Sequence, residues 1–225
     1  MDIAAEITKL HSELPSTVKL VAVSKFHPAS AVMEAYNAGQ RVFGENRPQE
    51  MAAKAKELPG DIEWHFIGHL QTNKLKMVLP YAAIVESVDS LHLLEAIDRW
   101  GGDNSKVTDV LLEYHVAAEE TKQGFGADEI RDILFSPEPF ANIRFRGLMG
   151  MATLTSDEKV IEEDFGKIIA LFDELSARTG ESPKLTEDFN LKSFGMTHDY
   201  RIAVRMGANI VRIGTLIFGE RQAKL

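Results

Sequence analysis

The chain contains no cysteine. This absence excludes disulfide bonds, zinc–thiolate sites, iron–sulfur clusters and thiol nucleophiles together. It is compatible with a reducing compartment, and we expect a cytoplasmic protein.

Long hydrophobic runs and basic clusters are also absent. No apolar stretch approaches the roughly 18 residues that cross a bilayer, and the first residues lack the basic and apolar regions of a signal peptide. We therefore expect no membrane association. Lysine and arginine are scattered through a chain with a net charge of −9, so a nucleic-acid partner is not expected. The same charge repels anions at long range, so a phosphate ligand would need local donors.

What the sequence does have is a regular alternation of short apolar runs and helical patterns. A helix is predicted over residues 49–58, another over 72–79, and one after Ser90, which is typical of an N-cap. The clearest helix begins at a predicted capping box, residues 155–158, and continues with an apolar stripe to Leu175. We predict strands at residues 18–24, 41–44, 63–68, 82–87, 109–116, 144–150, 189–194 and 209–213.

Eight strand–helix units in 225 residues favour a single (β/α)8 barrel of the TIM type over a doubly wound open sheet. The length fits the barrel, and no dinucleotide-binding fingerprint follows the first strand. Residues 1–225 are predicted to form one domain. The helical pattern over residues 3–14 precedes the first strand, so we expect an extra helix outside the barrel or across its bottom.

Two cationic residues end the first and last predicted strands. Lys25 follows a run that can be buried on both faces, and a lysine held there can lose its proton and condense with a carbonyl. Arg212 is followed by Gly214 and Thr215, a donor-rich corner suited to phosphate. In a closed barrel the first and eighth strands pair, so these residues are predicted to share one site at the C-terminal face. A solvated lysine and a surface-paired arginine are the structural alternatives.

A second hydroxyl for phosphate is predicted from Ser193, at the end of the seventh strand. The loops after strands seven and eight form the common phosphate site of such barrels. The alternative is that Ser193 and Thr197 only cap helices.

Four ordered segments resemble the pyridoxal-phosphate homeostasis protein family. They are residues 22–25, 43–47, 64–74 and 211–219. The resemblance spans nearly the whole chain and implies a barrel similar to the N-terminal domain of alanine racemase, with pyridoxal 5′-phosphate carried on Lys25.

The resemblance also implies roles for individual residues. It places the Arg212 guanidinium against the pyridine nitrogen of the cofactor, where a permanent cation keeps the ring unprotonated and a weak electron sink. It places Asn46 beside the ring, with capping of the next helix as the alternative. Residues 193–197 depart from the family's Ser-Met-Gly-Met-Ser pattern at Phe194 and Thr197. Glu119 and Lys122 match a family loop whose role the sequence does not reveal.

Two other motifs lack the structural context that their usual function requires. His65 and His69 have metal-like spacing, but Gly68 and the strand pattern break the helical geometry that such a site needs, so no metal is expected. Residues 214–219 have P-loop spacing without the lysine and hydroxyl that follow it.

The leading prediction is a monomeric binding protein without catalytic residues. It would hold pyridoxal 5′-phosphate as a Schiff base on Lys25 for storage, protection or delivery to apoenzymes. The first rival is a cofactor-dependent amino-acid racemase, which needs a second proton-transfer group on the opposite face of the cofactor. The second rival is a class I aldolase that uses the same lysine on a phosphosugar.

Overall fold

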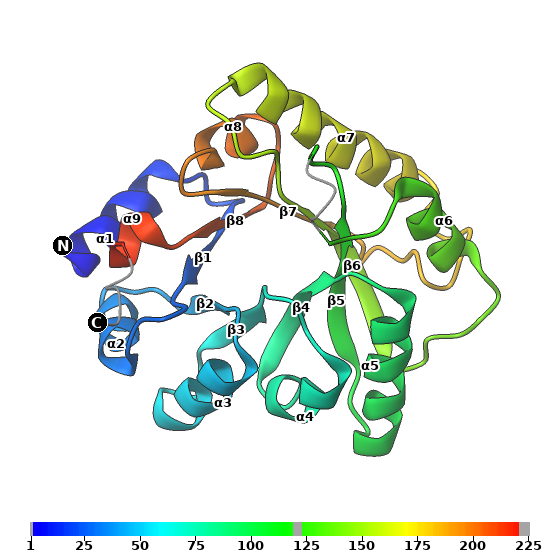
Figure 1. The fold of residues 1–225 in the computed structure, drawn as a ribbon, viewed down its shortest axis with the longest axis horizontal. Helices are drawn as coiled ribbons and strands as arrows, with labels where there is room; N and C mark the ends of the chain where they lie inside the picture. The colour runs from blue at the N-terminus through cyan, green and yellow to red at the C-terminus, as the bar shows by residue number, and fades with distance from the viewer. Residues whose placement is uncertain (1, 119–122, 221–225) are drawn as a thin grey trace.

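Eight parallel strands close into a barrel in the order of the chain, with β1 pairing to β8 (Figure 1). The computed structural model describes residues 2–118 and 123–220. The predicted (β/α)8 class is confirmed. The strands are β1 (Lys19–Val23), β2 (Val42–Glu45), β3 (Glu63–Phe66), β4 (Ala82–Val88), β5 (Thr108–Tyr114), β6 (Ile143–Gly150), β7 (Leu191–Met196) and β8 (Ile210–Ile213).

Helices surround the barrel (Figure 1). They are α1 (Ile3–Glu13), α2 (Ala29–Asn37), α3 (Pro48–Glu57), α4 (Leu75–Val78), α5 (Leu91–Asn104), α6 (Ala127–Phe135), α7 (Glu158–Ser176), α8 (Tyr200–Arg205) and α9 (Thr215–Phe218). A 3-10 turn, η1 (Thr72–Lys74), precedes α4, so the helix predicted over residues 72–79 is divided in two. The extra helix α1 contacts α2 and α9 and therefore lies outside the barrel.

The alternation of side chains along each strand separates two cores. Outward-facing residues pack under the helices, as Phe43 and Trp64 do with ring centroids 5.9 Å apart. Inside the barrel, Ile84, Leu111 and Met149 form a small apolar cluster of their own. The interiors of such barrels are usually filled by layers of branched apolar side chains. The small size of the inner cluster leaves room for the buried polar groups described below.

Several predicted boundaries are wrong in detail; β3 and β5, for example, each end two residues before the predicted end. Helix α7 begins at an Asp157 cap, whose carboxylate accepts from Lys159 N at 3.0 Å, and not at the predicted capping box. The Thr155 hydroxyl instead accepts from Asp157 N at 3.1 Å, which makes a turn before the helix. Strand β7 begins two residues later than predicted, because Phe189 leaves the strand register and stacks on Phe172.

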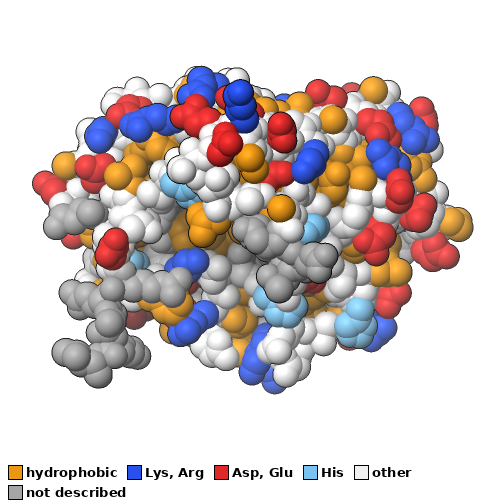
Figure 2. Space-filling model, turned by 45° about the horizontal axis from the view of Figure 1, so that its top comes forward, with side chains coloured by type: hydrophobic (Ala, Val, Ile, Leu, Met, Phe, Trp, Pro, Cys, Tyr) orange, Lys and Arg blue, Asp and Glu red, His pale blue; other side chains and the backbone are white. Residues whose placement is uncertain are grey.

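The surface agrees with the dispersed charge of the sequence. Acidic and basic side chains are interspersed on the face shown in Figure 2. Among residues 2–118 and 123–220, no helix is both long enough and apolar enough to cross a bilayer.

Candidate functional site

Lys25 lies at the C-terminal end of the barrel, two residues beyond the end of β1. Its side chain is half-buried. Ala22 pairs with Ile213 across the β1–β8 ladder, and a Cβ atom on Gly214 would lie 3.1 Å from the carbonyl oxygen of Val23. The end of β1 and the start of α9 are therefore neighbours.

Helix α3 and the end of β2 hold the peptides on both sides of Lys25. The Ser24 hydroxyl donates to Glu45 Oε1 at 2.6 Å, and Lys54 Nζ donates to the Ser24 carbonyl oxygen at 2.8 Å. Glu50 accepts from Phe26 N at 2.7 Å. Phe26 has a φ of 68°, a left-handed conformation that is uncommon for a bulky residue and is retained only where surrounding contacts impose it.

The ion pair behind this peptide is almost fully buried. Lys54 Nζ lies 2.5 Å from Glu45 Oε1, with 8% and 0% of the two side chains exposed. Burial raises the pKa of Glu45, although the charge and hydrogen bond of Lys54 oppose the shift. The pair thus fixes a rigid support under Lys25.

The loop after β7 meets the start of α9. Gly214 N donates to the Thr197 hydroxyl at 3.4 Å, and Thr215 is the exposed first residue of α9. His27 stacks on Phe218 with ring centroids 5.2 Å apart, which ties the segment after Lys25 to the same helix. The first N–H groups of a helix have no acceptor within it. Hydroxyls and backbone N–H groups therefore converge at this corner.

Arg212 reaches from β8 across the barrel and is only 4% exposed. Its Nη1 donates to the carbonyl and hydroxyl oxygens of Ser193, at 2.9 and 2.5 Å, and its Nη2 donates to the Gly150 carbonyl oxygen at 3.0 Å. A guanidinium has five N–H donors. The Nε–H and one Nη2–H have no acceptor among the described residues, so two donors remain for a ligand.

Ser193 lies inside the barrel, in the middle of β7, with no exposed surface. Its hydroxyl donates to Glu86 Oε2 at 2.5 Å while accepting from Arg212. The hydroxyl hydrogen is therefore already used, and Ser193 is separated from the hydroxyls of Thr197 and Thr215 by its place in the strand.

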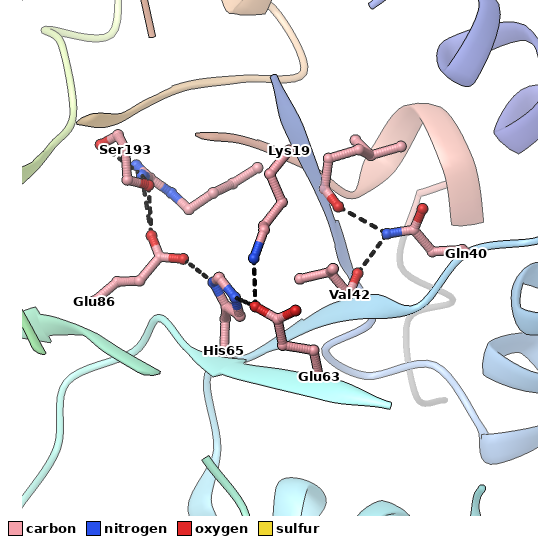
Figure 3. Close-up of polar contacts among 9 residues, drawn as sticks. Lys19, Gln40, Val42, Glu63, His65, Glu86 and Ser193 are labelled. Carbon is pink, nitrogen blue, oxygen red and sulfur yellow. Dashed lines mark hydrogen bonds and ion pairs between the residues drawn. The ribbon is translucent and has the colours of Figure 1, made fainter. Parts of the chain in front are cut away.

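A run of polar side chains crosses the barrel interior from Glu86 through His65 and Glu63 to Lys19 (Figure 3). Glu86 receives the Ser193 hydroxyl on one oxygen and faces His65 Nδ1 with the other. His65 Nε2 lies 3.1 Å from Glu63 Oε1, which lies 2.5 Å from Lys19 Nζ. We call this set the interior charge column; its members are Lys19, Glu63, His65, Glu86, Ser193 and Arg212.

Both nitrogens of the His65 ring face carboxylates, so both must donate and the ring is an imidazolium. Burial would lower the pKa of His65, but its hydrogen bonds to Glu63 and Glu86 outweigh burial and raise it. Burial would raise the pKa of Glu86, but the hydrogen bond from His65 and the charges of His65 and Arg212 lower it. The hydrogen bond from His65 also lowers the pKa of Glu63 to about 2.

Asn46 follows β2 at the mouth of the barrel. Its Oδ1 is buried and has no partner among the described residues. Helix α3 is capped by Arg47 without a side-chain hydrogen bond, so Asn46 does not cap it. Gly68 approaches this residue so closely that a Cβ atom there would lie 2.3 Å from the Asn46 carbonyl oxygen. The backbone of Asn46 is therefore fixed, and its amide is available.

Glu113 near the end of β5 was missed by the sequence analysis, although alternation from Leu111 predicts that it faces the barrel interior. It is 6% exposed, and its carboxyl makes no hydrogen bond or ion pair within residues 2–118 and 123–220. Burial raises the pKa of Glu113 to about 7; the charge of Asp89 adds to the shift, and those of Arg212 and His69 oppose it.

The two histidines with metal-like spacing have different partners. His65 belongs to the interior charge column, whereas half-exposed His69 pairs with Asp89 at 2.8 Å. No group of three or more potential metal ligands occurs in the described part of the chain. Glu119 and Lys122 lie outside the described residues.

Comparison with known proteins shows the family to which the chain belongs. A family model described as "Alanine racemase, N-terminal domain" matches residues 2–222, so the chain belongs to that family. Alanine racemase from E. faecalis shares the fold with a TM-score of 0.74 at 15% identity, over 97% of this chain and 58% of the racemase.

Nearer relatives narrow the class to the pyridoxal phosphate homeostasis proteins. The protein of Aquifex aeolicus is 38% identical over 91% of this chain and 87% of its own length. That of Haemophilus influenzae is 35% identical over 92% of this chain and 86% of its own length. The structure of PipY from Synechococcus elongatus without PLP has a TM-score of 0.89 at 36% identity, covering 96% of this chain and all of PipY. A second PipY structure, with PLP bound, has a TM-score of 0.86.

Proposed function

We propose that the chain binds pyridoxal 5′-phosphate as a Schiff base on Lys25 and serves cofactor homeostasis by storing, protecting or delivering it. The observation that carries this proposal is the convergence of three groups at one end of the barrel. They are a half-buried lysine on a rigid support, a hydroxyl-rich corner at the start of α9, and an arginine with two N–H donors that have no acceptor in the described parts of the chain. The PLP-bound PipY relative supports the same ligand.

The residues present fit the three parts of this cofactor. Lys25 would hold its aldehyde carbon, and the hydroxyls of Thr197 and Thr215 with the first backbone N–H groups of α9, next to Gly214, would hold its phosphate. The remaining N–H donors of Arg212 would face the pyridine nitrogen, and Asn46, whose Oδ1 has no partner among the described residues, would lie beside the ring. The bound cofactor would supply an electron-withdrawing ring, which Arg212 keeps weak by leaving the nitrogen unprotonated.

Ser193 takes a different role in this proposal from the one predicted by sequence. Its hydroxyl bridges Glu86 and Arg212, so it would orient the arginine rather than contact phosphate. We propose that the protein acts as a cytoplasmic monomer whose partners are apoenzymes that need the cofactor.

Absorbance and chemical trapping test the attachment. The loaded protein should absorb near about 420 nm, and borohydride should fix the cofactor onto the peptide that contains Lys25. A colourless protein would favour the aldolase, and trapping mainly at another lysine would refute the assignment. Lys56→Arg, an exposed change on α3, is the control that should leave trapping unchanged.

One observation favours a racemase-like enzyme as the second candidate. Glu113 is a buried carboxyl near the end of β5 with no hydrogen-bond partner among the described residues, and its pKa of about 7 suits proton transfer. The loaded protein should be incubated with L- and D-amino acids in deuterated water while exchange at Cα is monitored. Exchange with multiple turnovers that is lost in Lys25→Ala and in Glu113→Gln would establish the enzyme. No exchange, together with transfer of cofactor to an apo-aminotransferase, supports the binding protein.

A further inference from the structure

The interior charge column joins the two ends of the barrel. Lys19 and Glu63, with side chains 40% and 39% exposed, are open to solvent at the end where the strands begin. Glu86 and Arg212, with 0% and 4% of their side chains exposed, lie in the interior toward the other end. The residues between them are joined by direct contacts at every step (Figure 3).

The signs of the charges alternate along the column. Lys19, His65 and Arg212 are cations, and Glu63 and Glu86 are the anions between them. An isolated buried charge is costly, but each buried member here has a partner of opposite sign. Glu86 lies 3.7 Å from Arg212 Nη1 and has His65 on its other oxygen, so its charge is shared between two cations.

The geometry points to His65 and Glu86 as positioning residues that set the orientation of Arg212 and its effective charge at the ring nitrogen of the bound cofactor. This inference rests on the proposed function, because it concerns how the same site tunes its ligand. Neither residue reaches the ligand; both act through Arg212.

The sign of each charge makes the inference specific. Replacing Glu86 by glutamine removes the anion that offsets Arg212, so the site becomes more positive and a proton on the bound cofactor is less favourable. Replacing His65 by glutamine leaves Glu86 facing Arg212 alone, so the site becomes more negative and that proton is more favourable. A charge about 10 Å away at an effective dielectric constant of about 20 shifts a pKa by roughly one unit.

The experiment is a pH titration of the absorption spectrum of loaded protein. The midpoint should move to lower pH in Glu86→Gln and to higher pH in His65→Gln, by roughly one unit each. The double variant should return close to the parent. Glu57→Gln on α3 and His92→Gln on α5 change exposed residues of the same types and should leave the midpoint in place.

Ser193→Ala is a milder second variant, since it removes only the hydroxyl that links Glu86 to Arg212. It should shift the midpoint in the same direction as Glu86→Gln by a smaller amount. The inference would be overturned if the Glu86 and His65 variants moved the titration midpoint in the same direction, or if neither variant moved it. Purely structural damage would not depend on the sign of the charge removed.

Nuclear magnetic resonance of the cofactor-free protein separates this inference from the proposed function. With 15N-labelled histidine, both ring nitrogens of His65 should carry protons at neutral pH, and Glu86→Gln should lower the pH at which one is lost. A singly protonated His65 in the parent would contradict the column even if the cofactor binds. Doubly protonated His65 in a protein that never binds the cofactor would leave the column intact and defeat only the proposed function.

Discussion

The ammonium nitrogen of Lys54 lies 2.8 Å from the carbonyl oxygen of Ser24, so a helix-borne cation holds the peptide directly before Lys25. The same nitrogen lies 2.5 Å from Glu45 Oε1 in a buried pair. A buried pair of this kind adds little to stability when compared with apolar residues, but removing one partner leaves an uncompensated charge. Lys54 is therefore important both for folding and for the placement of Lys25.

Replacing Lys54 by methionine should lower the free energy of unfolding by about 3–5 kcal/mol, because Glu45 is left charged and buried. Urea denaturation measures this loss. Glu45→Gln in the same chain should recover part of it, since the glutamine side chain needs no counter-ion. Lys56→Met, which changes an exposed lysine two residues further along α3, is the matched control. Equal stability of the two lysine variants would show that the pair is unimportant.

Gly68→Ala should distort the end of β2. The new methyl group would lie 2.3 Å from the Asn46 carbonyl oxygen, a contact that only backbone movement can relieve. We expect a loss of stability of about 1–3 kcal/mol and weaker cofactor binding. Gly60→Ala is the control, because nothing lies within 4 Å of the added atom there. Thermal melting and cofactor titration measure both effects, and similar behaviour of the two variants would contradict the steric argument.

The barrel and the position of the main residues could be predicted from sequence for a simple geometric reason. Parallel strands that close in order bring their C-terminal ends to one face, so Lys25 after β1 and Gly214 after β8 had to be neighbours. This inference needs only strand order and is insensitive to errors of one or two residues at strand ends.

The interior of the barrel could not be predicted in the same way. The pairing of His65 with Glu86 depends on a register irregularity at Trp64/His65, which simple alternation does not reveal. The place of Ser193 depends on a strand that starts two residues later than its apolar pattern indicates. Side-chain partners therefore required the coordinates, even where the strand itself was predicted.

The two hydroxyl groups at the start of α9 should be selective for phosphate. Thr197→Ala combined with Thr215→Ala should weaken binding of pyridoxal 5′-phosphate by roughly 1.5–3 kcal/mol for each charge-assisted bond lost. Pyridoxal, which lacks the phosphate, should bind the double variant as well as it binds the parent. Equilibrium titration with both compounds measures the difference, and equal losses for the two would exclude these threonines from the phosphate site.

Unlike the threonine variants, Ser193→Ala should not discriminate between pyridoxal 5′-phosphate and pyridoxal. Its hydroxyl contacts Arg212 rather than the corner at α9, so binding of both compounds should weaken by a similar factor. The same two titrations provide the measurement. A loss confined to the phosphorylated compound would return Ser193 to the phosphate role that the sequence suggested.

Glu113 should make stability depend on pH with a definite sign. Its pKa is raised from 4.5 to about 7 in the folded protein, so folding favours the neutral acid. The stabilising contribution is fully present below pH 4.5 and is lost as the pH rises through about 7, because the buried carboxyl must then ionise. The loss amounts to about 3 kcal/mol at most.

Glu113→Gln, which cannot ionise, should therefore gain stability relative to the parent as the pH increases from 4.5 to 8. Urea denaturation at several pH values measures this difference, with exposed Glu187→Gln as the control. A difference between parent and Glu113→Gln that does not change with pH would mean that Glu113 ionises normally, and it would remove the acid–base argument for the enzyme.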